Sequence, residues 1–171
     1  MMMTISNSSP LIHLARLGKL GYVMKAFPSL TIPYAVRAET IEKGKHEGYS
    51  EALTLERLET EGWIKTVKLT SSQSTRTVTN LSKEIGRGEA EAIVLALEKK
   101  ERLLMDDQKG RRVASFYGIE TTTTLGLMFE LLIDGVVTKE DYRKNVKNYG
   151  SRGWIGAEIV QEFLERGDVV E

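Results

Sequence analysis

The stretch Gly86-Arg87-Gly88-Glu89-Ala90-Glu91-Ala92-Ile93, together with Arg102-Leu103-Leu104-Met105-Asp106-Asp107, decides the fold class of this chain. Apolar residues recur at helical spacing and predict a helix over 89–100 with one buried stripe that includes Leu97. The short apolar run that ends at two aspartates predicts a buried strand. A helix and the strand after it run in opposite directions in a parallel sheet, so Glu89 and Asp107 are predicted to lie at the same edge.

The same alternation of strands and helices extends over most of the chain. Predicted strands are 3–6, 30–32, 63–67, 102–105 and 119–122. Predicted helices begin near Pro10 and Pro33 and cover 50–61, 89–100, 109–117, 125–132, 139–148 and 155–166. Such alternation indicates an α/β domain of three layers, with a central parallel sheet between helices. We expect residues 1–137 to form this domain and 138–171 to form a C-terminal helical extension packed on it.

Local signals add finer expectations. Ser8 or Ser9 is expected to cap the helix that begins near Pro10, and Gly167 to cap the last helix. Leu53 is expected to point inward from helix 50–61, as are Leu55 and Leu58. The Ser/Thr-rich segment 69–80 is interpreted as an exposed loop or a linker helix.

Composition narrows the function classes. Lys and Arg number 24, as do Asp and Glu, so a nucleic-acid partner has to be held by a local basic patch. The chain has no cysteine, which excludes disulfides and thiolate metal sites and fits a reducing cytoplasm. We expect a cytoplasmic protein without a signal peptide or a membrane span. The absence of a Gly-rich phosphate loop argues against a Walker or dinucleotide site.

Four acidic side chains and one asparagine follow strand ends or open helices at one predicted edge of the sheet. Asn7 ends the first strand, Glu39 lies early in the helix after the second strand, and Glu89 opens the helix of the deciding stretch. Asp106 and Asp107 end the strand that follows. Mg²⁺ and Mn²⁺ prefer oxygen ligands, and carboxylates held together repel each other unless a cation or proton intervenes. The sequence therefore predicts a hard-cation site.

Four segments, in this order, resemble PIN-domain proteins. They are Ile5-Ser6-Asn7-Ser8-Ser9-Pro10-Leu11-Ile12-His13-Leu14-Ala15, Ile32-Pro33-Tyr34-Ala35-Val36 with Glu39, Gly86 to Ile93, and Leu104-Met105-Asp106-Asp107-Gln108-Lys109-Gly110-Arg111-Arg112. The segment Thr124-Leu125-Gly126 adds to the likeness. The resemblance covers nearly the whole chain and is closest to standalone prokaryotic PIN proteins related to VapC toxins.

This resemblance implies an endoribonuclease that depends on Mg²⁺ or Mn²⁺. The four acidic positions of the family fall on Asn7, Glu39, Glu89 and Asp107, and Ser9 is the hydroxyl residue expected to support the metal. Asp106 is a further candidate ligand, although of the two neighbouring aspartates Asp107 is expected to face the site. The resemblance also implies a role as the toxin of a toxin–antitoxin pair, an antitoxin partner and a homodimer.

Asn7 departs from the family pattern, which has aspartate at this position. An amide oxygen is a neutral ligand, so the site loses one of its four charges, and we expect a poorly active enzyme. Two explanations stay open: a deliberate replacement that disables a toxic nuclease, and a natural variant with weak or absent catalysis.

Simpler interpretations compete with the metal site. Glu89 alone is an ordinary acidic residue at a helix start, and the Asp106–Asp107 pair could simply end a strand and cap a helix. Glu39 could pair with Arg37 or Lys43 on its own helix. The chain could also be a non-catalytic PIN-like module that binds RNA or protein, or an α/β binding protein for an unrelated ligand.

Basic and aromatic residues supply further candidates. Arg87, Lys109, Arg111 and Arg112 could hold an RNA backbone or could be a solvated helix face. His13 is expected to pack at the edge of the core. The stripe of Ile155, Ile159 and Phe163 is either core or a groove for a partner helix, and Trp154 beside it indicates a partner or dimer surface.

Overall fold

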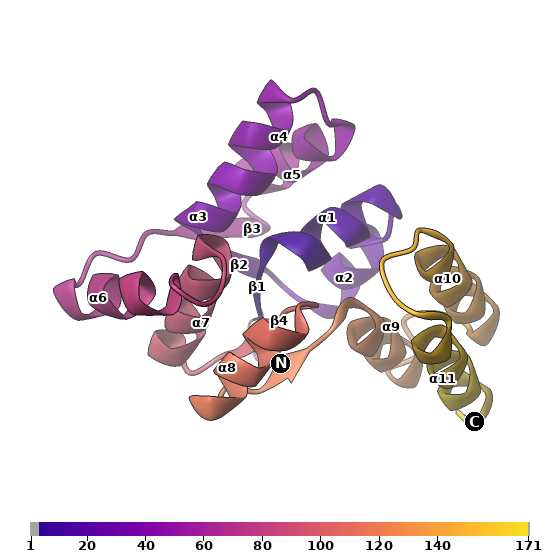
Figure 1. The fold of residues 1–171 in the computed structure, drawn as a ribbon. Helices are drawn as coiled ribbons and strands as arrows, with labels where there is room; N and C mark the ends of the chain where they lie inside the picture. The colour runs from indigo at the N-terminus through magenta and orange to yellow at the C-terminus, as the bar shows by residue number, and fades with distance from the viewer. Residues whose placement is uncertain (1–3, 171) are drawn as a thin grey trace.

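Five parallel strands form the central sheet of the computed structural model, which describes residues 4–170 (Figure 1). The strands are β1 (Thr4–Ser6), β2 (Leu30–Pro33), β3 (Ile64–Val67), β4 (Arg102–Leu104) and β5 (Thr121–Thr122). Their order across the sheet is β3-β2-β1-β4-β5, and all neighbours are parallel. The predicted parallel sheet is confirmed; Met3, the first residue of the first predicted strand, lies outside the described residues.

Helices cover both faces of this sheet, which confirms the predicted three layers (Figure 1). They are α1 (Ser8–Arg16), α2 (Leu20–Ala26), α3 (Tyr34–Arg37), the π-helix η1 (Ala38–Glu42), α4 (Lys43–His46), α5 (Ser50–Thr60), α6 (Ser72–Leu81), α7 (Arg87–Lys99), α8 (Gln108–Phe116), α9 (Thr124–Ile133), α10 (Lys139–Ser151) and α11 (Ala157–Asp168). Segment 69–80 is thus largely helical, and α2 is an element that the sequence did not predict.

Two hydrophobic cores separate at the sheet because successive strand residues point to opposite faces. Leu104 belongs to the core that α1, α2, α5 and α9 build, whereas Leu103 belongs to the core beneath α6, α7 and α8. Ile5 of β1 joins the second core, together with Ile93 of α7. The central strands are therefore buried on both sides, and their polar groups are accessible only at the strand ends.

The two C-terminal helices pack on α9 and share its hydrophobic core (Figure 1). Tyr142 of α10 and Leu164 of α11 are both buried there. Gly167 does not cap the last helix as predicted, because α11 continues to Asp168. A Cβ at Gly167 would lie 2.3 Å from Cε1 of Tyr142, so close packing explains this glycine. The domain boundary predicted between residues 137 and 138 stays a prediction.

Three further local expectations are wrong for identifiable reasons. Leu53 is 61% exposed, because Ala52, Leu55 and Leu58 define the buried face of α5 and Leu53 points away from it. Leu97 is 43% exposed in the last turn of α7, where it borders an open cavity. The cap of α1 is Asn7 instead of Ser8 or Ser9.

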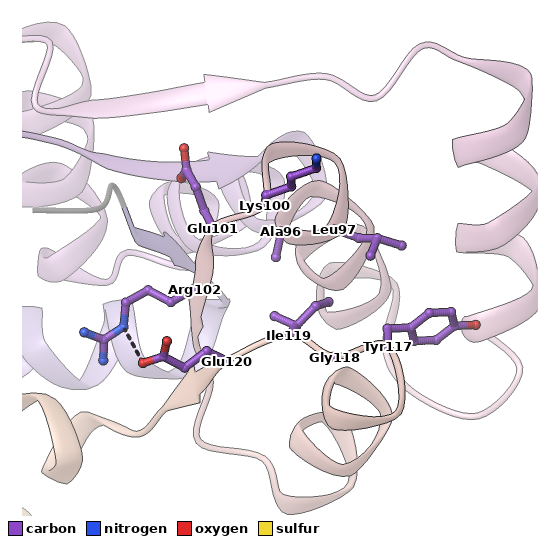
Figure 2. Close-up of a pocket in the computed structure, with 9 residues that line it drawn as sticks. All are labelled: Ala96, Leu97, Lys100, Glu101, Arg102, Tyr117, Gly118, Ile119 and Glu120. Carbon is purple, nitrogen blue, oxygen red and sulfur yellow. Dashed lines mark ion pairs between the residues drawn. The ribbon is translucent and has the colours of Figure 1, made fainter.

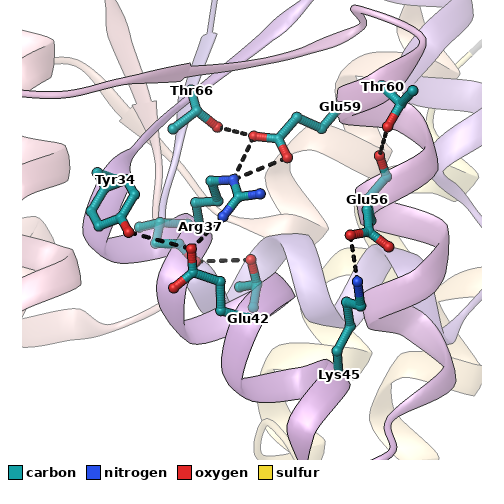
Figure 3. Close-up of polar contacts among 10 residues, drawn as sticks. Tyr34, Arg37, Glu42, Lys45, Glu56, Glu59, Thr60 and Thr66 are labelled. Atoms are coloured by element: carbon teal, nitrogen blue, oxygen red, sulfur yellow. Dashed lines mark hydrogen bonds and ion pairs between the residues drawn. The ribbon is translucent and has the colours of Figure 1, made fainter.

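A network of ion pairs ties α3 and η1 to α5 and β3 (Figure 3). Nε of Arg37 donates to both carboxylate oxygens of Glu59, at 2.8 and 3.0 Å, and the same guanidinium also pairs with Glu42. Thr66 of β3 donates to Glu59 at 2.5 Å. The network holds the helix that carries Glu39 in a fixed position beside the sheet.

Within residues 4–170, none of the helices combines the length and the apolar character that a membrane crossing requires.

Candidate functional site

The order of the strands reverses between β1 and β4. From β1 the chain continues to β2 and β3 on one side, and it then returns to place β4 and β5 on the other. Open α/β sheets bind their ligands outside the carboxyl ends of the strands at such a switch point. Asn7 follows β1 directly, and its backbone N–H donates to the carbonyl of Leu104 in β4 at 3.0 Å. The residues that follow β1 and β4 are thereby held side by side.

Asn7 is buried and serves two neighbours. Its Oδ1 accepts the backbone N–H of Ser8 at 2.7 Å and caps α1, which is why neither predicted serine is the cap. Its side chain also favours the charged form of the Glu89 carboxyl. The amide therefore stands close to an acidic residue.

Glu39 lies on the π-helix η1 and reaches the start of α7. Its carboxylate accepts a hydrogen bond from the hydroxyl of Ser8. A Cβ added at Gly88 would come within 2.8 Å of Oε2 of Glu39, so the glycine permits this approach. The alternative pairing with Arg37 or Lys43 does not occur: Arg37 binds Glu42 and Glu59 (Figure 3), and Lys43 lies 3.8 Å from Glu47.

The carboxyl of Glu89 has a raised pKa. Burial raises the pKa of its carboxyl, and the charges of Asp107 and Glu39 raise it further. The backbone N–H of Gly86, which donates to Oε2 at 3.1 Å, and the Asn7 side chain oppose this shift only in part. The shift shows that acids from three separate elements lie within electrostatic reach of one another. We call Asn7, Glu39, Glu89 and Asp107 the acidic cluster.

Asp107 is exposed and caps α8. Its Oδ1 accepts the backbone N–H of Gly110 at 2.6 Å, so the simple capping role considered for this residue is real. Capping occupies one of its two oxygens, and among residues 4–170 no hydrogen bond is found to the other. The residue thus serves the helix and still contributes negative charge beside Glu89.

Asp106 points into a different environment, which we call the Asp106 junction. Oδ1 accepts the N–H of Thr124 at 2.7 Å, and Oδ2 accepts the Thr124 hydroxyl at 2.7 Å and the Tyr149 hydroxyl at 3.1 Å. Nδ1 of His13 lies 2.9 Å from Oδ2. Burial alone would raise the pKa of Asp106, but the hydrogen bonds from His13 and Thr124 outweigh it and lower the pKa. Both oxygens of Asp106 are therefore engaged by the protein itself.

His13, Tyr149 and Ser8 are contacts that the sequence did not indicate. His13 was expected only to pack at the core edge, and it lies 93 positions from Asp106, too far for any local pattern to connect the two. Ser8 donates to Glu39, whereas Ser9, the hydroxyl predicted to support the metal, is exposed. Thr124, in the segment Thr124-Leu125-Gly126 that resembles the family, donates to Asp106, and no sequence pattern predicts this contact.

The basic candidates have different surroundings. Arg87 pairs with Glu91 at 3.1 Å, and Nζ of Lys109 donates to the carbonyl of Glu84 at 2.6 Å. Arg112 is exposed. Arg111 has a buried Nε without a hydrogen-bond partner among residues 4–170. The proposed contact of these four side chains with RNA stays a prediction.

The donor chemistry of the acidic cluster suits a hard cation, since it offers carboxylate oxygens whose charges are not neutralised. Among residues 4–170, however, no three His, Cys, Asp or Glu side chains are close enough together to surround one ion. Burial is the largest cause of the raised pKa of Glu89, and the charges of Asp107 and Glu39 add to it, so a bound cation would favour the charged form of this carboxyl. Glu39, Glu89 and Asp107 thus lie at one edge of the sheet, but their side chains are not arranged to coordinate one ion.

A cavity of about 230 Å³ lies at the opposite edge, where β4 and β5 begin (Figure 2). Charges around it neutralise each other: Arg102 lies 4.0 Å from Glu120 and 2.6 Å from Glu130. This edge therefore lacks the unbalanced charge of the acidic cluster.

Two comparisons identify proteins that are similar to this chain. A family model of the PIN domain matches residues 3–168. Among solved structures, the fold is similar to a PilT N-terminus domain protein from the hyperthermophilic archaeon Sulfolobus solfataricus, with a TM-score of 0.52 and 17% sequence identity. That similarity covers 77% of this chain and 94% of the archaeal chain, and at this identity it concerns the fold alone. No curated protein matches the chain.

Proposed function

Because the chain belongs to the PIN-domain family, we propose that it is an endoribonuclease that depends on Mg²⁺ or Mn²⁺. PIN domains are generally nucleases and typically use divalent metals, which supports the class of reaction. The substrate is RNA, and the reaction is hydrolysis of a phosphodiester bond.

Each residue of the acidic cluster has a distinct part in this proposal. Glu39, Glu89 and Asp107 would hold the cation through their carboxylates, and the Ser8 hydroxyl orients Glu39. Asn7 stands where the family has aspartate and contributes a neutral side chain. When bound there, the cation would supply the positive charge that lowers the pKa of a bound water and stabilises negative charge on the phosphate. With one negative charge fewer, the site binds the cation weakly and the enzyme is poorly active.

The observation that carries the proposal is the raised pKa of Glu89. Residues 39, 89 and 107 come from three different elements, and two of these acids act on the third. Burial contributes most to this shift, and the two neighbouring charges add to it; perturbed pKa values of this kind cluster at functional sites. This observation supports a metal site at the position where PIN domains are expected to have one.

The test is to replace Asn7 by aspartate. Mn²⁺-dependent cleavage of single-stranded RNA should rise about tenfold or more in Asn7→Asp, on the scale by which metal-site residues affect activity. The double variant Asn7→Asp/Glu89→Gln is the control, and it should lose the gained activity. If Asn7→Asp cleaves no faster than the original chain, position 7 has no metal role.

A second candidate is a non-catalytic PIN-like module that binds RNA. Asn7 favours it, because its neutral side chain caps α1 and stabilises the charged form of Glu89 without adding a carboxylate to the site. Calorimetric titration with Mn²⁺ separates the two: the nuclease binds the ion through Glu39, Glu89 and Asp107, and the module does not.

We extend the first proposal to a toxin role, an antitoxin partner and a homodimer on the ground of family membership. A gene for a small antitoxin-like protein beside this one would support the toxin role. Light scattering of the purified protein tests the dimer.

A further inference from the structure

A groove of about 440 Å³ lies between the start of α8 and the helix α11, beside the Asp106 junction. We call it the α8–α11 groove. Its volume is in the range of pockets that hold small organic ligands. The side chains that matter below are Gln108, Arg111, Trp154, Ile159, Glu162 and Phe163.

One wall of the groove is apolar and held in place from behind. The ring of Trp154 stacks on His13, with centroids 3.9 Å apart, and meets Tyr149 edge-on at 5.2 Å. His13 and Tyr149 are themselves fixed by Asp106. Ile159 and Phe163 continue this wall along α11, and Ile159 is 44% exposed. The wall is therefore preorganised, so a flat apolar ligand could pack on it with little loss of side-chain freedom.

The groove is also lined by a cation that forms no ion pair within residues 4–170. Arg111 lines the groove, and its buried Nε has no hydrogen-bond partner within residues 4–170. The two acids nearby are already engaged: Glu162 pairs with Arg166 at 2.5 Å, and Asp106 is saturated by its junction. Arg111 forms no ion pair within residues 4–170, and a guanidinium binds anionic oxygens strongly, so the groove suits a ligand with an anionic oxygen.

The groove also adjoins the acidic cluster. Asp106 lines the groove, whereas Asp107 caps α8 and belongs to the cluster. The N–H of Arg111 donates to the carbonyl of Asp107 at 3.0 Å, which places Arg111 one helical turn, roughly 5 Å, from that cap. Arg111 therefore lies about one helical turn from the acidic cluster, within the reach of one RNA strand bound there.

We propose that the α8–α11 groove binds one nucleotide of single-stranded RNA next to the cleaved bond. The phosphate contacts the guanidinium of Arg111, and the base packs on the wall of Trp154, Ile159 and Phe163. The pairing of an unneutralised cation with an apolar aromatic wall matches the two parts of a nucleotide, and stacking on such walls is typical of single-strand recognition. This inference rests on the proposed function, since RNA is the substrate of that same site.

Binding in the presence of EDTA tests the groove separately from catalysis. The anisotropy of a labelled short single-stranded RNA gives the affinity of Arg111→Met and Ile159→Asp, and each should bind about tenfold more weakly, the size of one lost contact. The matched controls lie on exposed positions of α5: Arg57→Met and Leu53→Asp should bind like the original chain. Circular dichroism and urea midpoints establish that all four variants are folded.

Two further readouts distinguish phosphate from base. In Arg111→Met, the slope of log affinity against log salt should fall by about 0.7, which corresponds to one phosphate contact on a single strand. Removal of bases from the RNA should lower its affinity for the original chain. The affinity of Ile159→Asp for the RNA should not change when the bases are removed. Wild-type RNA affinity in both groove variants overturns the inference, as does a loss confined to binding of a protein partner.

Failure of the groove and failure of the nuclease proposal give different results. Cleavage that persists in Asn7→Asp/Glu89→Gln counts against the acidic cluster as the catalytic site and leaves the RNA affinity measured in EDTA unaffected. RNA affinity that is unchanged in Arg111→Met and Ile159→Asp counts against the groove as a binding site. Such a result leaves the metal-dependent cleavage unaffected.

Discussion

Asp106 and Asp107 are adjacent in the sequence, yet they belong to regions of opposite electrostatic character. At the Asp106 junction every carboxylate oxygen has a protein donor, and the pKa of Asp106 is lowered in spite of burial. In the acidic cluster, Asp107 helps to raise the pKa of Glu89. The comparison separates acids that hold the fold together from acids that the fold leaves available for a ligand.

The difference originates in the geometry of the strand end. Past β4, successive side chains point to opposite sides, so Asp106 meets α1, α9 and α10 while Asp107 meets the start of α7. One peptide unit is therefore enough to divide a structural carboxylate from a candidate ligand.

The largest expected contrast is in stability. Asp106→Asn leaves partly buried donors unpaired and should lower the free energy of unfolding by about 3 kcal/mol. Asp107→Asn should change it by less than about 0.5 kcal/mol, because asparagine caps helices as well as aspartate does. Urea unfolding at neutral pH measures both values. Equal losses in the two variants would contradict the division between the regions.

Metal binding should show the reverse contrast. With Mn²⁺ at about a hundredfold excess over its Kd, the free energy of unfolding should rise by about 2.7 kcal/mol. Glu89→Gln should lose most of this gain. Glu120→Gln, at the opposite edge of the sheet (Figure 2), should keep it. Thermal unfolding with Mn²⁺ or EDTA provides the measurement, and a gain that survives in Glu89→Gln would remove that residue from the site.

Substitutions at two glycines test whether the position of the Glu39 carboxylate matters for metal binding. In Gly88→Ala the new methyl group would lie 2.8 Å from Oε2 of Glu39 and should displace that carboxylate, weakening Mn²⁺ binding about tenfold. Gly86→Ala is the matched control, since its nearest new contact is 3.8 Å from Oε2 of Glu89. Titration calorimetry compares them. Equal affinity in both variants would mean that Glu39 does not bind the ion.

The smallest effect is a dependence of stability on pH in EDTA. The pKa of Glu89 is raised above 4.5 in the folded state, so its contribution to stability is fully present below pH 4.5 and is lost as the pH rises through the folded pKa. At pH 7, Glu89→Gln should therefore unfold about 1–3 °C higher than the original chain, and the gain should vanish below pH 4.5.

The contribution of Asp106 to stability depends on pH in the opposite direction to that of Glu89. Because its pKa is lowered in the folded state, Asp106 contributes stability that is present above pH 3.8 and is lost as the pH falls through the folded pKa. Thermal unfolding between pH 3 and 7 follows both groups, and a stabilisation of Glu89→Gln that persists at low pH would show that repulsion is not its cause.

The sequence predicted the sheet and its edge because these depend on periodic patterns. Helical spacing around Ile93 and the apolar run before Asp106 are local signals, and the parallel arrangement follows from their alternation. The Asp106 junction could not be predicted, because its partners His13, Thr124 and Tyr149 come from three distant helices. The inward orientation predicted for Leu53 is wrong for a related reason. Apolar residues indicate that α5 is a helix, but the elements packed against α5 decide which of its faces is buried.

The π-helix that carries Glu39 has a consequence for how this family can vary. A π turn contains one residue more than an α turn, and such bulges in helices occur frequently at functional sites. Deleting a single residue between Ala38 and Glu42 would convert the segment to regular α-helix and rotate everything on one side of the deletion by about 100°. The acid at position 39 would then no longer share a register with the ion pairs that anchor its helix. A single-residue insertion or deletion at this point is therefore a step by which a PIN domain could gain or lose one of its acids without disturbing its sheet.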